Sequence, residues 1–228
     1  MGDFDQVPFG SVDFAENPSQ RVPCVLVLDT SASMQGEKIN KLNQGLVTFA
    51  NELQADAIAA KSAEVAIVTF GPVEVLDNPP FITADDFFPV TLSAQSTTPM
   101  GEAIVQAIDL CRQRKDELKA AGIAYYRPWI FLITDGSPTD DVTAAKAEIE
   151  SGEEARNFVF YAVGVEGANM NVLADLSVRD PLKLKGMSFR EMFQWLSASI
   201  RAISGSQIGD EVPLEDPTKG PSGWAAYN

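Results

Sequence analysis

The sequence predicts an α/β fold, with an open, mostly parallel and doubly wound sheet, helices on both faces, and one antiparallel strand at an edge. Three observations predict it. Short apolar runs recur along the chain, amphipathic stretches lie between most of them, and polar residues follow the ends of the apolar runs. Continuous apolar runs are typical of strands covered on both faces, and their alternation with helices is typical of parallel sheets. We therefore expect a Rossmann-like architecture.

Six segments are expected to form strands. Four are rich in β-branched or aromatic residues and are candidates for the middle of the sheet, namely "CVLVLD", "EVAIVTF", "WIFLITD" and "NFVFYAVGV". The segment "GPVEVLDNPPF" follows the second of these after a Gly-Pro break, which predicts the return strand of a hairpin at the sheet edge. "PLKLKG" is expected to be a last short strand.

Three segments have apolar residues at helical spacing, which predicts amphipathic helices. The first holds Ile39, Leu42, Leu46, Phe49 and Leu53, the second Ile104, Ile108 and Cys111, and the third Phe189, Met192, Phe193, Leu196, Ile200 and Ile203. Trp195 lies off the apolar stripe of the third helix, where it would pack in the core or face a partner. Asp140 and Asp141 are expected in the first turn of a further helix, because the helix dipole favours acids there.

Composition excludes several classes of function. The 228 residues, 45% of them hydrophobic, suffice for one domain with an ample core. The 32 acidic and 17 basic residues leave a net charge of −15, which argues against nucleic acid and against an anionic membrane as partners. The chain has no histidine, which excludes Ser-His-Asp and Cys-His nucleophiles and His-ligated zinc. A cation or a basic protein is the favoured ligand.

The two ends of the chain differ in composition from its middle. Residues 1–20 and 205–228 are rich in Pro, Gly, Ser and acids, so we expect an extended N-terminal arm, one domain at 21–204, and a C-terminal arm packed on it. Cys24 and Cys111 lack a CxxC spacing and are expected to be buried thiols in a reducing compartment. No segment has the pattern of a signal peptide or membrane span, so we expect a cytoplasmic protein.

Oxygen-bearing side chains follow the ends of the predicted strands. Asp29, Ser31 and Ser33 follow the first strand in "VLVLDTSAS", Asp135 ends a later one in "WIFLITD", and Thr98 stands at the entry to a helix. Ligand sites of open α/β sheets lie beyond the carboxyl ends of the strands. Carboxylates and hydroxyls suit Mg²⁺, Mn²⁺ or Ca²⁺ rather than a soft metal. These five residues are the candidate metal ligands.

Each of these residues also has a purely structural interpretation. Asp29 and Asp135 could be turn residues, Ser31 and Ser33 could cap the following helix, and Thr98 could be an N-cap before a proline at the first helical position. Five such residues in this order, on three separate loops, favour a shared metal site over five unrelated caps.

The order of these residues resembles the metal-ion-dependent adhesion site (MIDAS) of von Willebrand factor type A (VWA) domains. The family pattern DxSxS stands here as "DTSAS", the threonine at the helix entry as "TTPMGEA", and the later aspartate as "LITDG". Three segments, "VPFGSVDFAENPSQRVPCVLVLDTSASMQG", "YYRPWIFLITDGSPTD" and "FREMFQWLSASI", are similar to the bacterial TerY-like branch, associated with tellurite-resistance and stress-response gene clusters. Ser96 and Thr97 stand where many relatives have two glycines, so the loop offers Thr97 beside Thr98.

The resemblance implies the VWA fold and one divalent ion, Mg²⁺ first, with Mn²⁺ or Ca²⁺ as alternatives. Ser31 and Ser33 would bind it directly, Thr98 directly or through water, and the two aspartates mostly through water. Neutral hydroxyls would leave the ion electrophilic, so that an Asp or Glu of a partner protein completes its shell, and the ion reverses the local sign of an acidic surface. The resemblance further implies a protein kinase and a PP2C-type phosphatase as partners, in a stress-response, tellurite-resistance or phage-defence signalling module.

Other functions fit the sequence less well. A phosphatase of the haloacid-dehalogenase type needs a second acid two residues after the first, and that position is Ser31. A nucleotide site would need GxGxxG or GxxxxGK[ST] after a strand, and "TSASMQGEK" has neither. We therefore expect no enzyme. The alternatives are a VWA adaptor that recruits substrates to an AAA+ ATPase and, less well supported, a metal-dependent phosphohydrolase.

Overall fold

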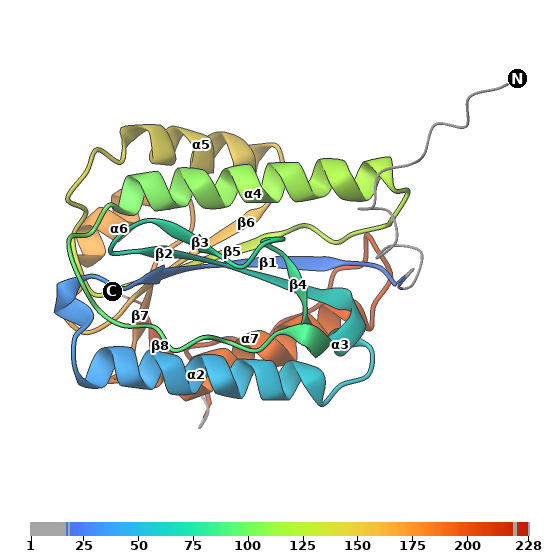
Figure 1. The fold of residues 1–228 in the computed structure, drawn as a ribbon, viewed down its shortest axis with the longest axis horizontal. Helices are drawn as coiled ribbons and strands as arrows, with labels where there is room; N and C mark the ends of the chain where they lie inside the picture. The colour runs from blue at the N-terminus through green and yellow to red at the C-terminus, as the bar shows by residue number, and fades with distance from the viewer. Residues whose placement is uncertain (1–16, 18, 221–222, 228) are drawn as a thin grey trace, which may run out of the picture.

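Helices cover both faces of a central sheet in the computed structural model, which describes residue 17, residues 19–220 and residues 223–227 (Figure 1). In these residues the sheet has eight strands: β1 (Val22–Asp29), β2 (Ala63–Phe70), β3 (Glu74–Leu76), β4 (Ile82–Thr83), β5 (Trp129–Thr134), β6 (Val159–Gly164), β7 (Leu182–Leu184) and β8 (Ala225–Ala226). Most of the expected N-terminal arm lies outside the described residues.

The predicted fold class is confirmed by the pairing of the strands. Their order is β3-β2-β1-β5-β6-β7-β8, with β4 also paired to β2. The four central pairings, from β2 through β1, β5 and β6 to β7, are parallel. The expected antiparallel edge strand is β3, and the structure adds two more antiparallel strands, β4 beside β2 and β8 beside β7.

The middle strands are buried on both faces, as their continuous apolar sequences predict. Every residue of β1, β2 and β5 is buried. Helices α2 (Glu37–Gln54), α3 (Ala59–Ser62) and α7 (Phe189–Ser204) pack on one face, and α4 (Met100–Ala120), α5 (Thr143–Glu154) and α6 (Met170–Leu176) on the other (Figure 1). Short 3₁₀ turns, η2 (Ala32–Met34) and η3 (Ala84–Asp86), complete the elements.

The apolar stripes of the helices face the sheet and each other. The predicted core positions of α2 are all buried, and those of α7 are buried except Ile203, which is partly buried. Gly45 lets α2 approach α7 closely, because a Cβ there would come within 2.5 Å of the Phe193 ring. None of the helices in the described part of the chain is long and apolar enough to span a bilayer.

The C-terminal segment lies against the domain. Trp224 is buried, and the two residues after it pair with β7 as strand β8. Trp195 of α7 packs against Trp224 and Trp129, and its indole N–H donates to the carbonyl of Glu215 at 2.8 Å. The Trp195 ring is therefore partly buried against the chain's own C-terminal segment.

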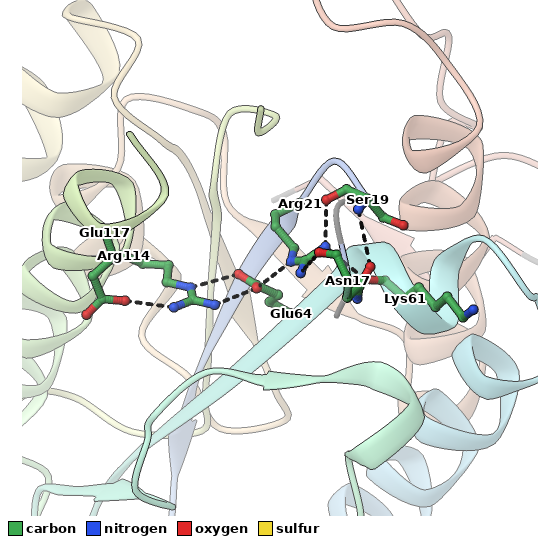
Figure 2. Close-up of polar contacts among 7 residues, drawn as sticks. All are labelled: Asn17, Ser19, Arg21, Lys61, Glu64, Arg114 and Glu117. Atoms are coloured by element: carbon green, nitrogen blue, oxygen red, sulfur yellow. Dashed lines mark hydrogen bonds and ion pairs between the residues drawn. The ribbon is translucent and has the colours of Figure 1, made fainter. Parts of the chain in front are cut away.

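Charged side chains are buried at the amino ends of β1 and β2 (Figure 2). The Glu64 carboxylate of β2 accepts a hydrogen bond from Arg21 Nε at 2.9 Å and two from the Arg114 guanidinium of α4 at 2.6 and 2.9 Å. Arg21 also donates to the carbonyls of Asn17 and Ser19, each at 2.6 Å. The cluster thus joins the chain before β1 to β2 and α4.

Candidate metal centre

Three loops meet beyond the carboxyl ends of β1 and β5, where the strand order reverses. The chain leaves β1 to form β2 on one side, whereas β5 lies on the other side of β1. Backbone bonds join the loops, since Gln95 N–H donates to the carbonyl of Thr30 at 2.7 Å and Thr139 N–H to that of Thr98 at 2.9 Å. The switch point between two parallel strands is where open α/β sheets bind ligands.

Carboxylates and hydroxyls form a continuous chain at this point. The backbone N–H of Ser31 donates to Asp29 Oδ1 at 2.8 Å, and the hydroxyls of Ser31 and Ser33 lie 3.0 Å apart. The Ser33 hydroxyl donates to Asp135 Oδ1 at 2.6 Å. Residues 102 positions apart in the sequence therefore touch, and four of the five candidate ligands belong to one network.

Thr98 completes the group from the third loop. Its side chain is buried and lies beside Gly136. A Cβ at Gly136 would lie 3.6 Å from the Thr98 hydroxyl and 3.7 Å from Asp29 Oδ2, so the missing side chain leaves room between them. Thr97, the alternative in this loop, is exposed. The structure thus brings together all five predicted residues.

Asp29 is fully buried, and its neighbours in the described part of the chain are neutral donors. Its carboxylate accepts from Ser31 and from the Thr134 hydroxyl, which in turn accepts from Gly136 N–H. Among the described residues no lysine or arginine forms an ion pair with it. Burial raises the pKa of the Asp29 carboxyl above its usual value, although the hydrogen bonds from Ser31 and Thr134 act in the opposite direction.

Asp135 is held differently, by a residue that sequence reasoning missed. Lys38, the second residue of α2, places its ammonium 2.5 Å from Asp135 Oδ2. The Asp135 side chain is fully buried, and that of Lys38 is 21% exposed. Gly167, in the loop after β6 and with φ +100°, passes over this pair. Lys38 stands soon after the DxSxS segment, at the start of α2, and no pattern in the sequence marks it as the partner of Asp135.

The helix ends do not support the capping interpretations of Ser31, Ser33 and Thr98. Asp29, in contrast, accepts from the N–H two residues on, as a turn residue does. Helix α2 begins after Gly36, and neither its start nor that of η2 has a side-chain cap. Thr98 does not cap α4 either, because Pro99 holds the N-cap position. Instead, Asp140 Oδ1 and Oδ2 accept from the N–H groups of Gly101 and Glu102 at 3.1 and 2.9 Å.

The expectation that Asp140 and Asp141 lie in the first turn of the next helix was wrong. Helix α5 begins at Thr143, and Asp141 accepts from the Thr143 N–H and hydroxyl just before it. Asp140 caps α4 from a distant loop, because the free N–H groups at a helix start attract a carboxylate.

The family follows from the sequence match. Residues 24–191 match the model of the von Willebrand factor type A domain, which is well over half of the chain. This chain belongs to the von Willebrand factor type A family. No curated protein matches it by sequence.

Solved structures share the fold of this A domain. The pilus adhesin SpaC from Lactobacillus rhamnosus GG aligns with a TM-score of 0.63 at 12% identity, over 79% of this chain and 30% of its own. VWA2, the ArnB paralog from Sulfolobus acidocaldarius, aligns with a TM-score of 0.51 at 20% identity, over 78% of this chain and 44% of its own. The vWF domain of the type V pili tip protein Mfa5 from Porphyromonas gingivalis aligns with a TM-score of 0.53 at 11% identity, over 85% of this chain and 98% of its own. The A domain spans less than half of the SpaC and VWA2 chains, and these identities show the fold alone.

The donor set of the A domain fits a hard divalent cation. It consists of two buried carboxylates and three hydroxyls, and hard cations prefer such oxygen ligands. Within the described residues no group of three or more His, Cys, Asp or Glu side chains is arranged to hold a metal. The hydroxyls therefore distinguish this centre from sites built of acids alone.

Proposed function

We propose that this A domain is a protein-binding module that works through one divalent cation at its metal centre. Ser31, Ser33 and Thr98 would hold the ion with their hydroxyls, and Asp29 and Asp135 would orient the shell around it. The ion, Mg²⁺ first with Mn²⁺ and Ca²⁺ as alternatives, supplies a positive charge on an acidic surface. An Asp or Glu of the partner is the group that this charge attracts.

The buried, uncompensated carboxylate of Asp29 carries this proposal. A buried charge without a partner is costly, and proteins normally pair such groups or use them to coordinate metals. Asp29 lies beside hydroxyls that offer only neutral oxygen atoms, so its charge remains available to a cation. Family membership supports the same conclusion, because VWA domains often mediate metal-dependent protein interactions.

We further propose that the module binds and does not catalyse. Both acids of the centre contact groups that fix their orientation, Asp29 the Thr134 hydroxyl and Asp135 the Lys38 ammonium. Neither is free to serve as a general base within reach of a substrate. The protein kinase and PP2C-type phosphatase partners, and the stress-response or tellurite-resistance setting, are proposed from the TerY-like segments of the sequence alone.

Calorimetric titration tests the metal centre. The protein, freed of metal by EDTA and dialysed, is titrated with Mg²⁺, Mn²⁺ and Ca²⁺. We expect one saturable site that is lost in Asp29→Ala and Ser31→Ala and weakened in Thr98→Ala. Thr97→Ala, which changes an exposed neighbour, is the matched control and should bind as the native protein does. Equal binding by native protein and Asp29→Ala would exclude this centre.

Partner binding is tested with purified components. We expect a kinase or PP2C-type phosphatase from the same gene cluster to bind the native A domain with Mg²⁺ and to be released by EDTA. A folded Ser31→Ala, Ser33→Ala double variant that still bound the partner in EDTA would refute a role for the ion in docking.

A further inference from the structure

The two acids of the metal centre differ in their electrostatic surroundings. Asp135 is paired with the Lys38 ammonium, whereas Asp29 has no such partner in the described residues. Lys38 contacts the oxygen of Asp135 that Ser33 does not use, so the carboxylate meets the hydroxyl network with one oxygen and the ammonium with the other. Both contacts can persist together because they occupy different atoms.

This arrangement sets the charge of the centre. Together, Asp29, Asp135 and Lys38 carry one net negative charge, so a bound divalent ion would leave the group with one net positive charge. Without Lys38 the loaded centre would be neutral. The Lys38 side chain is mostly buried and Asp135 fully so, and charges in such places are screened less by salt than exposed ones.

We propose that Lys38 makes the metal and the partner's carboxylate bind cooperatively. This inference rests on the proposed function, because it requires a divalent ion at the centre. Lys38 opposes the divalent ion when the ion is alone, because two positive charges then share one buried carboxylate. It favours a carboxylate on the loaded centre, because that anion meets a net positive charge. The A domain would therefore hold its ion weakly until an acidic residue arrives.

A purely structural role for Lys38 predicts the opposite sign. If Lys38 only anchored Asp135, its removal would let the carboxylate move and metal affinity would fall. Lys38→Met keeps the length and apolar stem of the side chain and removes its charge, so the direction of the change separates the two roles. Lys38→Gln is a second variant that retains a hydrogen-bond donor for Asp135.

The test measures Mn²⁺ binding by the electron paramagnetic resonance signal of the free ion, with and without sodium acetate at matched ionic strength. A blank titration corrects for acetate that binds Mn²⁺ in solution. In the native protein we expect acetate to tighten Mn²⁺ binding several-fold. In Lys38→Met and Lys38→Gln we expect binding without acetate to be tighter by about tenfold, and the effect of acetate to shrink.

Lys41→Met is the matched control. It removes the same charge one turn further along α2, at a lysine that forms no ion pair with Asp135, and it should behave as the native protein does. Binding by Lys38→Met that is equal to or weaker than native, or an undiminished acetate effect, overturns the inference while the metal centre stands. If neither the native protein nor the variants bind Mn²⁺, the proposed metal centre and the role of Lys38 are both overturned.

Discussion

At the scale of single residues, two aspartates at the same edge of one sheet have different roles. Asp135 has a cation of the protein itself on one oxygen. Asp29 has, among the described residues, the neutral Ser31 and Thr134 as hydrogen-bond donors and no ion pair, and burial raises the pKa of its carboxyl. The difference arises from Lys38, which reaches one acid and not the other. Burial of the Asp29 charge therefore destabilises the folded protein.

Asp29→Asn should stabilise the metal-free protein and abolish metal binding. The folded pKa of Asp29 lies above the unfolded value, so the folded state binds more protons between the two and its stability falls as pH rises through that window. At neutral pH the Asp29 carboxylate is ionised, so the full free-energy cost of burying its charge is present. The uncharged amide of the Asn variant removes this cost. We expect a higher Tm in EDTA, by about 2–4 °C for each kcal/mol recovered.

Thermal unfolding in EDTA across acidic to neutral pH checks this prediction. The difference in Tm between Asp29→Asn and the native protein should shrink as pH falls, because the native carboxyl then becomes neutral. A difference that does not vary with pH would show that the titration of Asp29 does not contribute. Mn²⁺ should raise the Tm of the native protein but not that of Asp29→Asn.

At the scale of elements, the start of α4 depends on a loop that follows β5. Asp140 caps the helix across 39 positions of sequence, and the carbonyl of Thr98 accepts from Thr139 in the same loop. The cap and this backbone bond place the loop with Asp135 against the loop with Thr98. Part of the geometry of the proposed metal centre therefore depends on the capping of one helix.

Asp140→Ala should destabilise the fold by about 1–2 kcal/mol, because two N–H groups at the start of α4 lose a charged acceptor. Asp141→Ala is the control, since Asp141 is exposed and bonds only within its own turn, and it should cost less. Urea unfolding of both variants measures the two values. Similar losses from the two substitutions would contradict the assigned cap.

At the scale of the whole molecule, polar groups are buried at both ends of the sheet. The proposed metal centre lies at the carboxyl ends of β1 and β5, and the Arg21, Glu64 and Arg114 cluster at the amino ends of β1 and β2 (Figure 2). The eight residues of β1 separate the two by roughly 25 Å. The apolar core between them should keep their effects independent.

Glu64→Gln should cost about 3–5 kcal/mol of stability, because two arginines would keep their burial and lose their shared charge. The divalent metal affinity should stay at the native value. Glu117→Gln, which removes the exposed partner of Arg114, should cost less than about 1 kcal/mol. Chemical unfolding and metal titration of both variants provide the comparison. A change in metal affinity in Glu64→Gln would show that the two ends are coupled.

The sequence by itself predicted the fold class, strands β1, β2, β3, β5, β6 and β7, helices α2, α4 and α7, and the five residues of the candidate centre. It did not predict β4, β8, α3 or α6, and it placed the start of α5 too early. The predicted features are local: a buried strand needs a continuous apolar run, an amphipathic helix needs its spacing, and the DxSxS motif fits in one turn. The family pattern linked the three loops. Strands, helices and the DxSxS motif can thus be derived from neighbouring residues, whereas joining the three loops needed the family pattern.

The tertiary structure alone decided which distant charges meet. Lys38 reaches Asp135 across 97 positions, Asp140 caps α4 across 39, and Arg114 meets Glu64 across 50. It also packed Trp195 against the C-terminal segment and, within the residues that the structure describes, gave Asp29 no ion pair. The physical reason is that ion pairs and caps depend on strand order and helix packing, whereas a charged side chain in the sequence carries no periodic signal of its partner.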